Sequence, residues 1–348
     1  MASTETGTPK GRATIREVAS AAGVSIATVS RVLNGRPDVS PETREAVMRA
    51  VRDQGFRTNR NARALSGGKT GLVGVTLPVV HGGHFTAILA GVTDGLYEHD
   101  MRAVLCPTLH QHEREVNLLE RLMHGTTDAG ILMLPEESND ELRALQRHGY
   151  PFVVVDPRTR PEEGIAAVSA ANASGARLAT EHLLALGHRR IGAITGPLGW
   201  LASSERLNGF RSALSSAGVL PDPDLVQEAG FAPGAGDEAA ATLLDLSDRP
   251  TAIFAFNDEL AISVLRAARE RGLRVPDDIS VVGFDDSEKA RITTPALTSV
   301  RQPLAEMGRM AITLLLQLLE SRDAAGVSVE LAIRLVERDS TGPPSASP

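Results

Sequence analysis

Most of this chain alternates between short apolar runs and longer amphipathic stretches, and this alternation restricts the fold more than any other feature. It begins near residue 71 and continues to about residue 336. Short apolar runs between turn residues predict strands buried on both faces, whereas the amphipathic stretches predict helices. Strands that alternate regularly with helices form parallel α/β sheets.

The expected strands are 72–77, 103–106, 129–134, 152–155, 190–195, 225–228, 252–256, 279–284 and 329–336. The expected helices are 84–98, 112–124, 138–148, 173–187, 203–217, 236–246, 258–272 and 303–320. A region of this length is long for one sheet, so two lobes are expected within residues 71–340. The N-lobe should comprise about 71–168 and 301–325, and the C-lobe about 172–298 and 328–340. The polar ends, 1–12 and 341–348, are expected to be disordered.

The segment before this region has a different pattern, which predicts three short helices. Thr14 with Glu17 forms a capping box, and Gly23 marks a tight turn before a second helix that starts at Ser25. A third helix should start at Ser40 with proline in its first turn. Residues 13–57 are therefore expected to form a helix-turn-helix domain, and residues 58–70 a hinge segment and linker.

Charge is divided unequally along the chain. Residues 1–66 hold 11 Lys and Arg against 6 Asp and Glu, whereas the remainder holds 25 against 37. A basic head on an acidic body is expected when phosphate binding is confined to the head. Taken alone this asymmetry decides little, because many proteins have solvated basic faces.

Several classes of protein are not supported by the residues. Cys106 is the only cysteine, which fits a reducing cytoplasm, and its place in an expected strand favours burial over nucleophilic chemistry. The first 13 residues have no apolar signal segment, and no apolar run is long enough to cross a membrane. The histidines have no metal-binding spacing, no nucleophile elbow or P-loop occurs, and Pro233 interrupts the one loose dinucleotide match at 234–239. We therefore expect a cytoplasmic protein without enzymatic activity, cofactor, metal or membrane contact.

A series of motifs resembles the lactose-repressor (LacI/GalR) family of bacterial transcription regulators, from Thr14 to about Ser340. In the head, the resemblance lies in residues 19–34, 39–44, 55–57 and 59–65. In the body, it lies in residues 187–191, 206–210, 250–254, 257–258, 275–276 and 281–286. This implies an N-terminal all-α helix-turn-helix domain and an α/β two-lobed body like that of periplasmic sugar-binding proteins. It also implies a homodimer, or a tetramer of two dimers, that binds double-stranded operator DNA and a small effector.

The resemblance assigns DNA-contacting roles in the second helix. Ile26 and Ala27 occupy positions that vary with operator sequence, and they can contact only thymine methyl groups because their side chains cannot donate hydrogen bonds. Arg31 is expected to read guanine. The remaining polar residues are expected to contact phosphates: Thr14, Ser25, Thr28, Ser30 and Asn34. For Thr14 and Ser25, the alternative is that they serve only as helix caps.

Residues 59–65 resemble the hinge helix of that family. Here Leu65 would be driven into the minor groove, Ala62 would let two such helices approach closely, and Asn59 and Arg60 would contact DNA. If the body moves the two hinge segments apart, the wedge is lost and specific affinity falls. The alternative is a plain linker helix.

Effector-binding residues are expected where strands end. By resemblance, Arg206 and Asp285 are paired anchors, since arginine donates in a fork and a carboxylate accepts twice. The other expected contacts are His84, Phe85, Asp156, Trp200, Phe231, Asn257 and Asp258. Four alternatives stay open: a structural ion pair for Arg206 or Asp285, lobe packing for Trp200, a plain helix start at His84, and a helix cap at Asp258.

These expectations add up to a repressor of carbohydrate-utilisation genes that a small sugar releases from its operator. One alternative is a co-repressed regulator or an activator that responds to a purine or a sugar phosphate. Another, from a different class, is a sugar-modifying enzyme with a DNA-binding head, although no catalytic constellation supports it. An exported sugar-binding protein is disfavoured by the basic head.

Overall fold

The computed structural model describes residues 13–33, 36–56, 69–80, 83–321 and 324–345. The chain divides into two compact units, Met1–Thr70 and Gly71–Pro348. The expected hinge positions Asn59, Arg60, Ala62 and Leu65, together with Asn34, lie outside the described residues.

The first unit contains the three predicted helices, α1 (Ile15–Ala22), α2 (Ile26–Leu33) and α3 (Pro41–Asp53). Thr14 and Glu17 form the predicted capping box, and Gly23 ends α1 in the left-handed conformation, with φ of 67°. Val18, Val29, Val32 and Val47 are buried together between the helices. One face of α2 is thereby committed to this small core.

The N-lobe of the second unit is built on a parallel sheet in the order β11-β5-β4-β3-β1-β2. Its strands are β1 (Leu72–Leu77), β2 (Arg102–Pro107), β3 (Ala129–Met133), β4 (Phe152–Val155), β5 (Ala167–Ala170) and β11 (Ser328–Leu331). Its helices are α5 (Gly83–Glu98), α6 (His112–Arg121), α7 (Asn139–Arg147) and α13 (Leu304–Glu320), and α6 continues into a π-helical turn, Leu122–Thr126.

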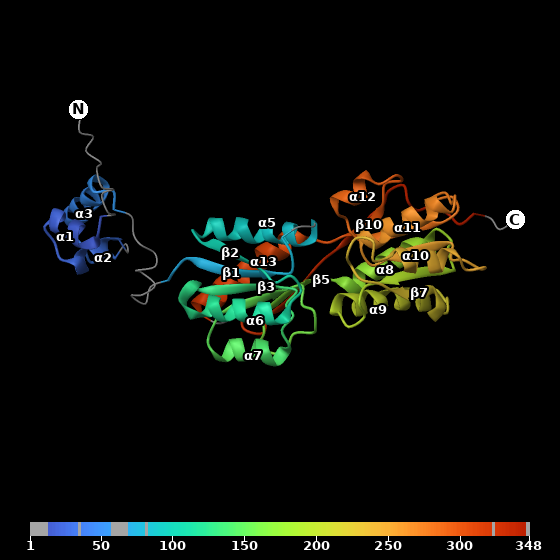
Figure 1. Cartoon of the computed structure of the whole chain (residues 1–348), viewed down its shortest axis with the longest axis horizontal. Coiled ribbons are helices and arrows are strands. Elements are labelled where there is room, and N and C mark those ends of the chain that lie inside the picture. The colour runs from blue at the N-terminus through green and yellow to red at the C-terminus, as the bar shows by residue number, and fades with distance from the viewer. Residues whose placement is uncertain (1–12, 34–35, 57–68, 81–82, 322–323, 346–348) are drawn as a thin grey trace, which may run out of the picture. The chain divides into compact units, whose positions relative to one another are not determined.

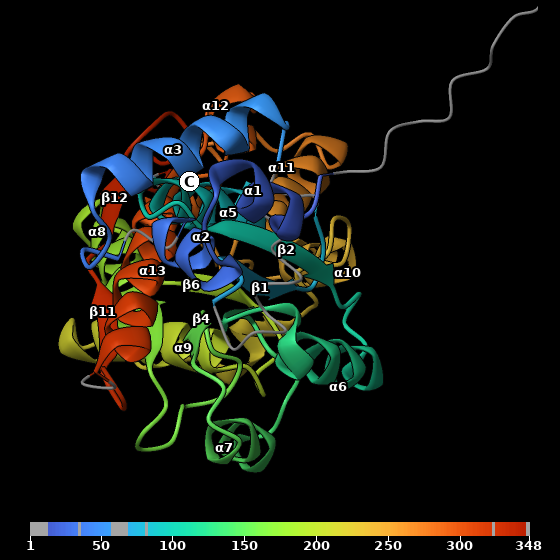
Figure 2. The same cartoon turned by 90° about the vertical axis from the view of Figure 1, so that its left-hand side faces the viewer.

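Neighbouring residues on these strands enter different cores, because successive side chains in a strand point to opposite faces. Ile131 and Met133 pack with α5 and α13, whereas Leu132 packs with α6 and α7. Figures 1 and 2 show α6 and α7 on the side of the sheet away from α5. Cys106 is buried in the second of these cores, as expected, and burial raises the pKa of its thiol.

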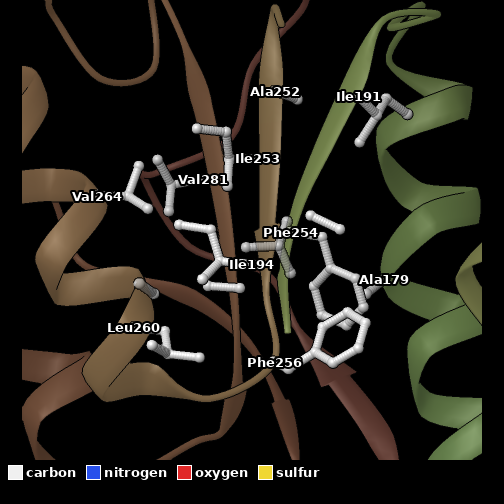
Figure 3. Packing of buried hydrophobic residues seen from close by; sticks show 14 of the residues in the cluster. Ala179, Ile191, Ile194, Ala252, Ile253, Phe254, Phe256, Leu260, Val264 and Val281 are labelled. Atoms are coloured by element: carbon white, nitrogen blue, oxygen red, sulfur yellow. The ribbon is translucent and has the colours of Figure 1, made fainter. Parts of the chain in front are cut away.

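The C-lobe sheet has the order β12-β10-β9-β8-β6-β7, and β12 pairs antiparallel with β10. Its strands are β6 (Ile191–Thr195), β7 (Val226–Glu228), β8 (Ala252–Ala255), β9 (Ser280–Asp285), β10 (Thr298–Arg301) and β12 (Arg334–Val336). Its helices are α8 (Asn172–Ala185), α9 (Leu201–Ser216), α10 (Asp237–Leu244), α11 (Asp258–Glu270) and α12 (Glu288–Ile292). Figure 3 shows Leu260 and Val264 of α11 beside Ile253 and Val281, with Ala179 of α8 across the sheet.

The main chain passes between the lobes three times, from β5 to α8, from β10 to α13, and from β11 to β12. Two boundaries differ from the sequence analysis. The expected strand 329–336 is two strands, and β11 pairs with β5, so residues 328–331 belong to the N-lobe rather than the C-lobe. Residues 298–301 form β10, so the C-lobe extends to Arg301 before the chain crosses back.

The prediction that the C-terminal tail is disordered from residue 341 is wrong for its first residues. Thr341 Oγ1 lies 2.9 Å from His182 Nε2, and the Gly342 carbonyl lies 2.8 Å from His188 Nε2. Ser340, directly before them, is fully buried and bonded to β9. These polar contacts anchor the tail to the C-lobe, which composition alone does not indicate.

Candidate functional site

Helix α2 has a buried face and an exposed face, and the exposed face carries the residues expected to read DNA. Val29 and Val32 are buried, whereas Ala27 and Arg31 are exposed and Ile26 is 44% exposed. Ser30 is half-buried. Because residues four apart share a helix face, Ile26, Ala27, Ser30 and Arg31 line one side of α2.

The two expected capping residues do cap helices. Ser25 Oγ accepts from the Thr28 amide at 3.1 Å, and Thr14 Oγ1 accepts from Glu17 at 3.4 Å. Arg31 lies 3.7 Å from Asp38, with both side chains about 60% exposed. An ion pair so exposed is worth little, so the guanidinium can exchange this partner for a DNA group.

The expected effector residues meet in the second unit, where strands of both lobes end. His84 lies in the first turn of α5, and Asp156 follows β4, with the His84 Nε2 to Asp156 Oδ2 distance at 3.0 Å. Arg206 projects from α9, and Asp285 ends β9. The carboxyl ends of parallel strands are where open α/β folds bind ligands.

Electrostatics link these four residues across the two lobes. Burial disfavours charge on His84, but its hydrogen bond to Asp156 and the negative charges of Asp156 and Asp285 outweigh burial, so the pKa of His84 is raised. Burial opposes charge on Asp156 as well, but the bond to His84 and the charges of His84 and Arg206 lower its pKa. Positive and negative groups therefore alternate across this cluster.

Three contacts hold the long side chain of Arg206 in place. Its Nε donates to Asn172 Oδ1 at 2.9 Å, its Nη1 donates to the Phe256 carbonyl, and its guanidinium carbon lies 3.8 Å from the centre of the Phe284 ring. Among the described residues, Nη2 has no hydrogen-bond acceptor. A buried, preorganised guanidinium with a spare donor can bind a ligand oxygen at low entropic cost.

Asp285 is the carboxylate that faces this arginine. Its Oδ1 accepts from Gln302 Nε2 at 2.7 Å. Burial raises the pKa of Asp285, while the positive charges of His84 and Arg206 oppose that rise. Its φ of 112° is rare for a residue with a side chain, and such conformations concentrate at functional sites.

Aromatic side chains form the neighbouring wall. The Trp200 and Phe231 ring centres are 5.6 Å apart, and the Arg158 guanidinium lies 4.7 Å from the Trp200 ring centre. The Leu201 amide donates to the Arg158 carbonyl at 2.8 Å, so the start of α9 contacts the N-lobe. Trp200 thus contacts the other lobe and also forms part of an aromatic surface.

Three expected residues have other observed contacts. Phe85 is partly buried against the N-lobe core. Asn257 caps α11, because its Oδ1 accepts from the Leu260 amide at 2.8 Å. The alternative of a helix cap at Asp258 is therefore wrong by one residue. Both Asp258 oxygens are occupied by C-lobe donors, Ser299 Oγ and the Ser287 amide.

Sequence reasoning missed Gln302, Asn172 and Arg158. Gln302 follows β10, a strand that was not predicted. Arg158 stands two residues after Asp156, and this spacing in the loop after β4 was the one available signal.

Comparison with known proteins identifies the family. The model of the bacterial regulatory proteins of the lacI family matches residues 14–59, and the periplasmic binding protein-like domain matches residues 180–341. The HTH-type transcriptional repressor PurR of Edwardsiella ictaluri (strain 93-146) is 35% identical over 329 residues, 94% of this chain and 96% of that protein. The chain belongs to the LacI family of bacterial regulatory proteins.

Two solved structures of transcriptional regulators cover nearly all of this chain. The complex of the transcriptional regulator CelR with cellobiose has a TM-score of 0.73 and 35% identity, over 94% of this chain and 100% of that one. The lac repressor dimer bound to operator and the anti-inducer ONPF has a TM-score of 0.84 and 29% identity, over 95% and 100%. The predicted helix-turn-helix region and two-lobed α/β body are thereby confirmed, and these relatives are transcriptional regulators rather than enzymes. No helix among the described residues is long and apolar enough to cross a membrane.

Proposed function

We propose that this LacI-family regulator is a cytoplasmic repressor of carbohydrate-utilisation genes that releases its operator when a small sugar binds between the lobes. It acts as a homodimer or as a pair of dimers. The observation that carries the proposal is the alternating cluster of His84, Asp156, Arg206 and Asp285, which draws on both lobes. A ligand that bonds to all four holds the lobes in one relative position.

The chemistry of this cluster favours an uncharged polyol. Arginine offers paired donors and carboxylates offer paired acceptors, which suit adjacent hydroxyl groups. Each cation of the cluster faces a carboxylate, so a phosphate of about −2 charge would be repelled by Asp156 and Asp285. Trp200, Phe231 and Phe85 supply apolar surface, and Asn257 is the remaining candidate for ligand contact. The CelR–cellobiose complex supports the carbohydrate class.

For the DNA module, we propose that Ile26, Ala27 and Arg31 meet base edges in the major groove. Phosphate contacts are assigned to the polar residues of this module: Thr14, Ser25, Thr28, Ser30 and Asn34. The hinge assignments of Asn59, Arg60, Ala62 and Leu65 remain proposals as well. Exposure of the α2 face and the operator-bound lac repressor relative support this assignment.

Release then follows from differential binding. A sugar that prefers one relation of the lobes shifts the population towards it, and the hinge pair loses its operator geometry. Coupling of about 1–3 kcal/mol is typical of such systems. The same geometry serves a co-repressed regulator or an activator that responds to a purine, in which the sign of coupling is reversed, and the PurR relatives favour keeping this second candidate.

The test is selection of genomic fragments by the purified full chain at physiological salt, with and without ligands. The panel contains cellobiose, ribose, a hexose phosphate and a purine base. We expect specific fragments to be retained without ligand and released by an uncharged sugar. Tighter retention with the purine would establish the second candidate, and turnover of any sugar would instead revive an enzyme.

Arg31 gives a test at one residue. Arg31→Ala should relax base preference at one position of each half-site, because a bidentate arginine–guanine pair discriminates by about 1–3 kcal/mol. Selection from randomised operators measures this. Arg49→Ala, which removes an equally exposed charge from α3, should leave the preference profile unchanged. An unaltered profile in Arg31→Ala would exclude base reading by this residue.

A further inference from the structure

The loop after β9 has an unusual backbone. Asp285 and Asp286 have φ of 112° and 51°, respectively, and both carry side chains. Residues with side chains rarely adopt such positive φ values, and these conformations persist only where the surroundings enforce them. The contacts that enforce this loop therefore decide where the Asp285 carboxylate points.

Asp258 provides that enforcement from the first turn of α11. Its Oδ2 accepts from the Ser287 amide at 2.7 Å, and its Oδ1 accepts from Ser299 Oγ at 2.6 Å. Ser299 Oγ in turn accepts from the Asp286 amide at 3.0 Å. The two amides that follow Asp285 are thus both held, directly or through one hydroxyl, by a carboxylate only 2% exposed.

Two further observations indicate that these hydrogen bonds, here called the Asp258 brace (Asp258, Ser287, Ser299 and the Asp286 amide), hold the loop after β9 in place. A Cβ at Gly283 would overlap Asp258 Oδ1, so β9 has its glycine where this carboxylate approaches the strand. The Asp286 carboxylate is fully buried and bonded to the guanidinium groups of Arg301 and Arg338. The loop is therefore fixed from β10 and from the segment after β12, as well as from α11.

We propose that Asp258 is a positioning residue, which holds the loop 285–287 so that Asp285 faces Arg206 and the effector, and does not itself contact the effector. The identity of the effector in this proposal rests on the proposed function, but the hydrogen bonds from Asp258 to the loop do not depend on a ligand. It reassigns a residue that the sequence analysis placed among the effector contacts.

The ionisation of Asp258 provides a readout that a purely structural role would not move. The groups that face it are Ser299 from β10, Ser287 before α12, Asp285 from β9 and Arg206 from α9. Burial, with the charge of Asp285 nearby, raises the pKa of Asp258 to about 7. Protonation removes one acceptor, so the brace should be complete above this pH and weakened below it.

The first experiment uses the full chain without ligand. Hydrogen–deuterium exchange of peptides spanning residues 285–287 should accelerate about tenfold in Asp258→Asn. Asparagine has one acceptor oxygen where aspartate has two, so it cannot accept from both the Ser287 amide and Ser299 Oγ, which itself accepts from the Asp286 amide. Ser299→Ala, which removes the linking hydroxyl but keeps Asp258, serves if Asp258→Asn does not fold. Glu259→Gln is the control, since that neighbouring carboxylate pairs with Lys289 instead. Unchanged exchange in this loop would overturn the proposal.

The second experiment measures cellobiose affinity by calorimetry. Asp258→Asn should bind about tenfold more weakly above pH 7, and this ratio should narrow as pH falls below 7. In the Asp285→Asn background, Asp258→Asn should add nothing, because its effect acts through Asp285. Additive losses, or a ratio independent of pH, would show a direct or unrelated role. If the wild-type protein binds no cellobiose, the proposal of a sugar effector loses support. The hydrogen-exchange experiment still tests whether Asp258 holds the loop.

Discussion

At the scale of single residues, Glu115 and Glu137 make the stability of the N-lobe depend on pH. Both are at least 95% buried, and one Glu115 oxygen and both Glu137 oxygens have no donor among the described residues. Burial raises the pKa of Glu115 to about 7, and burial with the charge of Glu115 raises that of Glu137 to about 9. At neutral pH the folded protein therefore retains protons that the unfolded chain releases.

The sign of the pH dependence follows. These folded pKa values exceed the ordinary value of 4.5, so their contribution to stability is lost as pH rises from about 4.5 through 7 to 9. Glu137→Gln keeps the shape without the ionisable proton and should raise the free energy of unfolding at pH 8 by about 1–3 kcal/mol. Urea unfolding, followed by the fluorescence of the single Trp200, measures this at pH 5 and pH 8. Glu113→Gln, which changes an exposed carboxyl in the same helix as Glu115, should leave the free energy of unfolding unchanged at both pH values. A destabilised Glu137→Gln at pH 8 would contradict the expectation.

The candidate site was predicted unevenly at this scale. The sequence predicts His84, Asp156, Arg206 and Asp285, and the structure brings them together. Arg206 and Asp285 lie in family motifs, Asp156 follows a strand, and His84 lies in the first turn of a helix. Asn257 and Asp258 were named as a pair, but which of the two caps α11 depends on side-chain geometry that a dipeptide does not specify. Gln302 was missed, since a residue is identified as following a strand only when the strand itself is recognised.

At the scale of elements, helices α5 and α13 pack closely against each other. A Cβ at Gly308 would overlap the Ile88 carbonyl oxygen and lie 2.7 Å from the Val92 nitrogen. Both are backbone atoms, which cannot move aside without shifting a helix. Gly308→Ala should therefore lower the free energy of unfolding by at least about 1–3 kcal/mol, despite the higher helix propensity of alanine.

Urea unfolding of the full chain checks this, again through Trp200. Gly83→Ala is the matched control, because it lies in α5 with no atom within 4 Å of the added Cβ. It should be neutral or slightly stabilising. Equal stability of Gly308→Ala and wild type would mean that the two helices do not pack this closely in solution.

Elements were predicted well where they are long and apolar, and poorly where they are short. β5 (Ala-Val-Ser-Ala) and β10 (Thr-Ser-Val-Arg) were missed, because four residues of small or polar type give no period that distinguishes a strand from a loop. α12, with five residues, was missed for the same reason. The sequence predicts one strand over residues 329–336, because apolar character alone does not show that the chain leaves one sheet and joins another.

At the scale of the whole molecule, the uneven charge separates two tasks. The basic residues of the first 66 positions supply attraction to phosphates, whereas the excess of acidic residues in the remainder opposes it. Binding to DNA should therefore be confined to the first unit, and the ligand chemistry to the second. A regulator built this way works only if the two units are coupled.

That coupling has a quantitative consequence, since the linkage between two binding sites is reciprocal. If the effector sugar weakens operator binding by a given factor, of roughly 5–150, saturating operator must weaken sugar binding by the same factor. Fluorescence anisotropy of labelled operator measures the first factor, and calorimetry of the sugar with and without operator measures the second. Asp285→Asn should weaken the sugar response while preserving operator affinity. If the affinity for the sugar is the same with and without operator, the two sites are not coupled, even if each binds its own ligand.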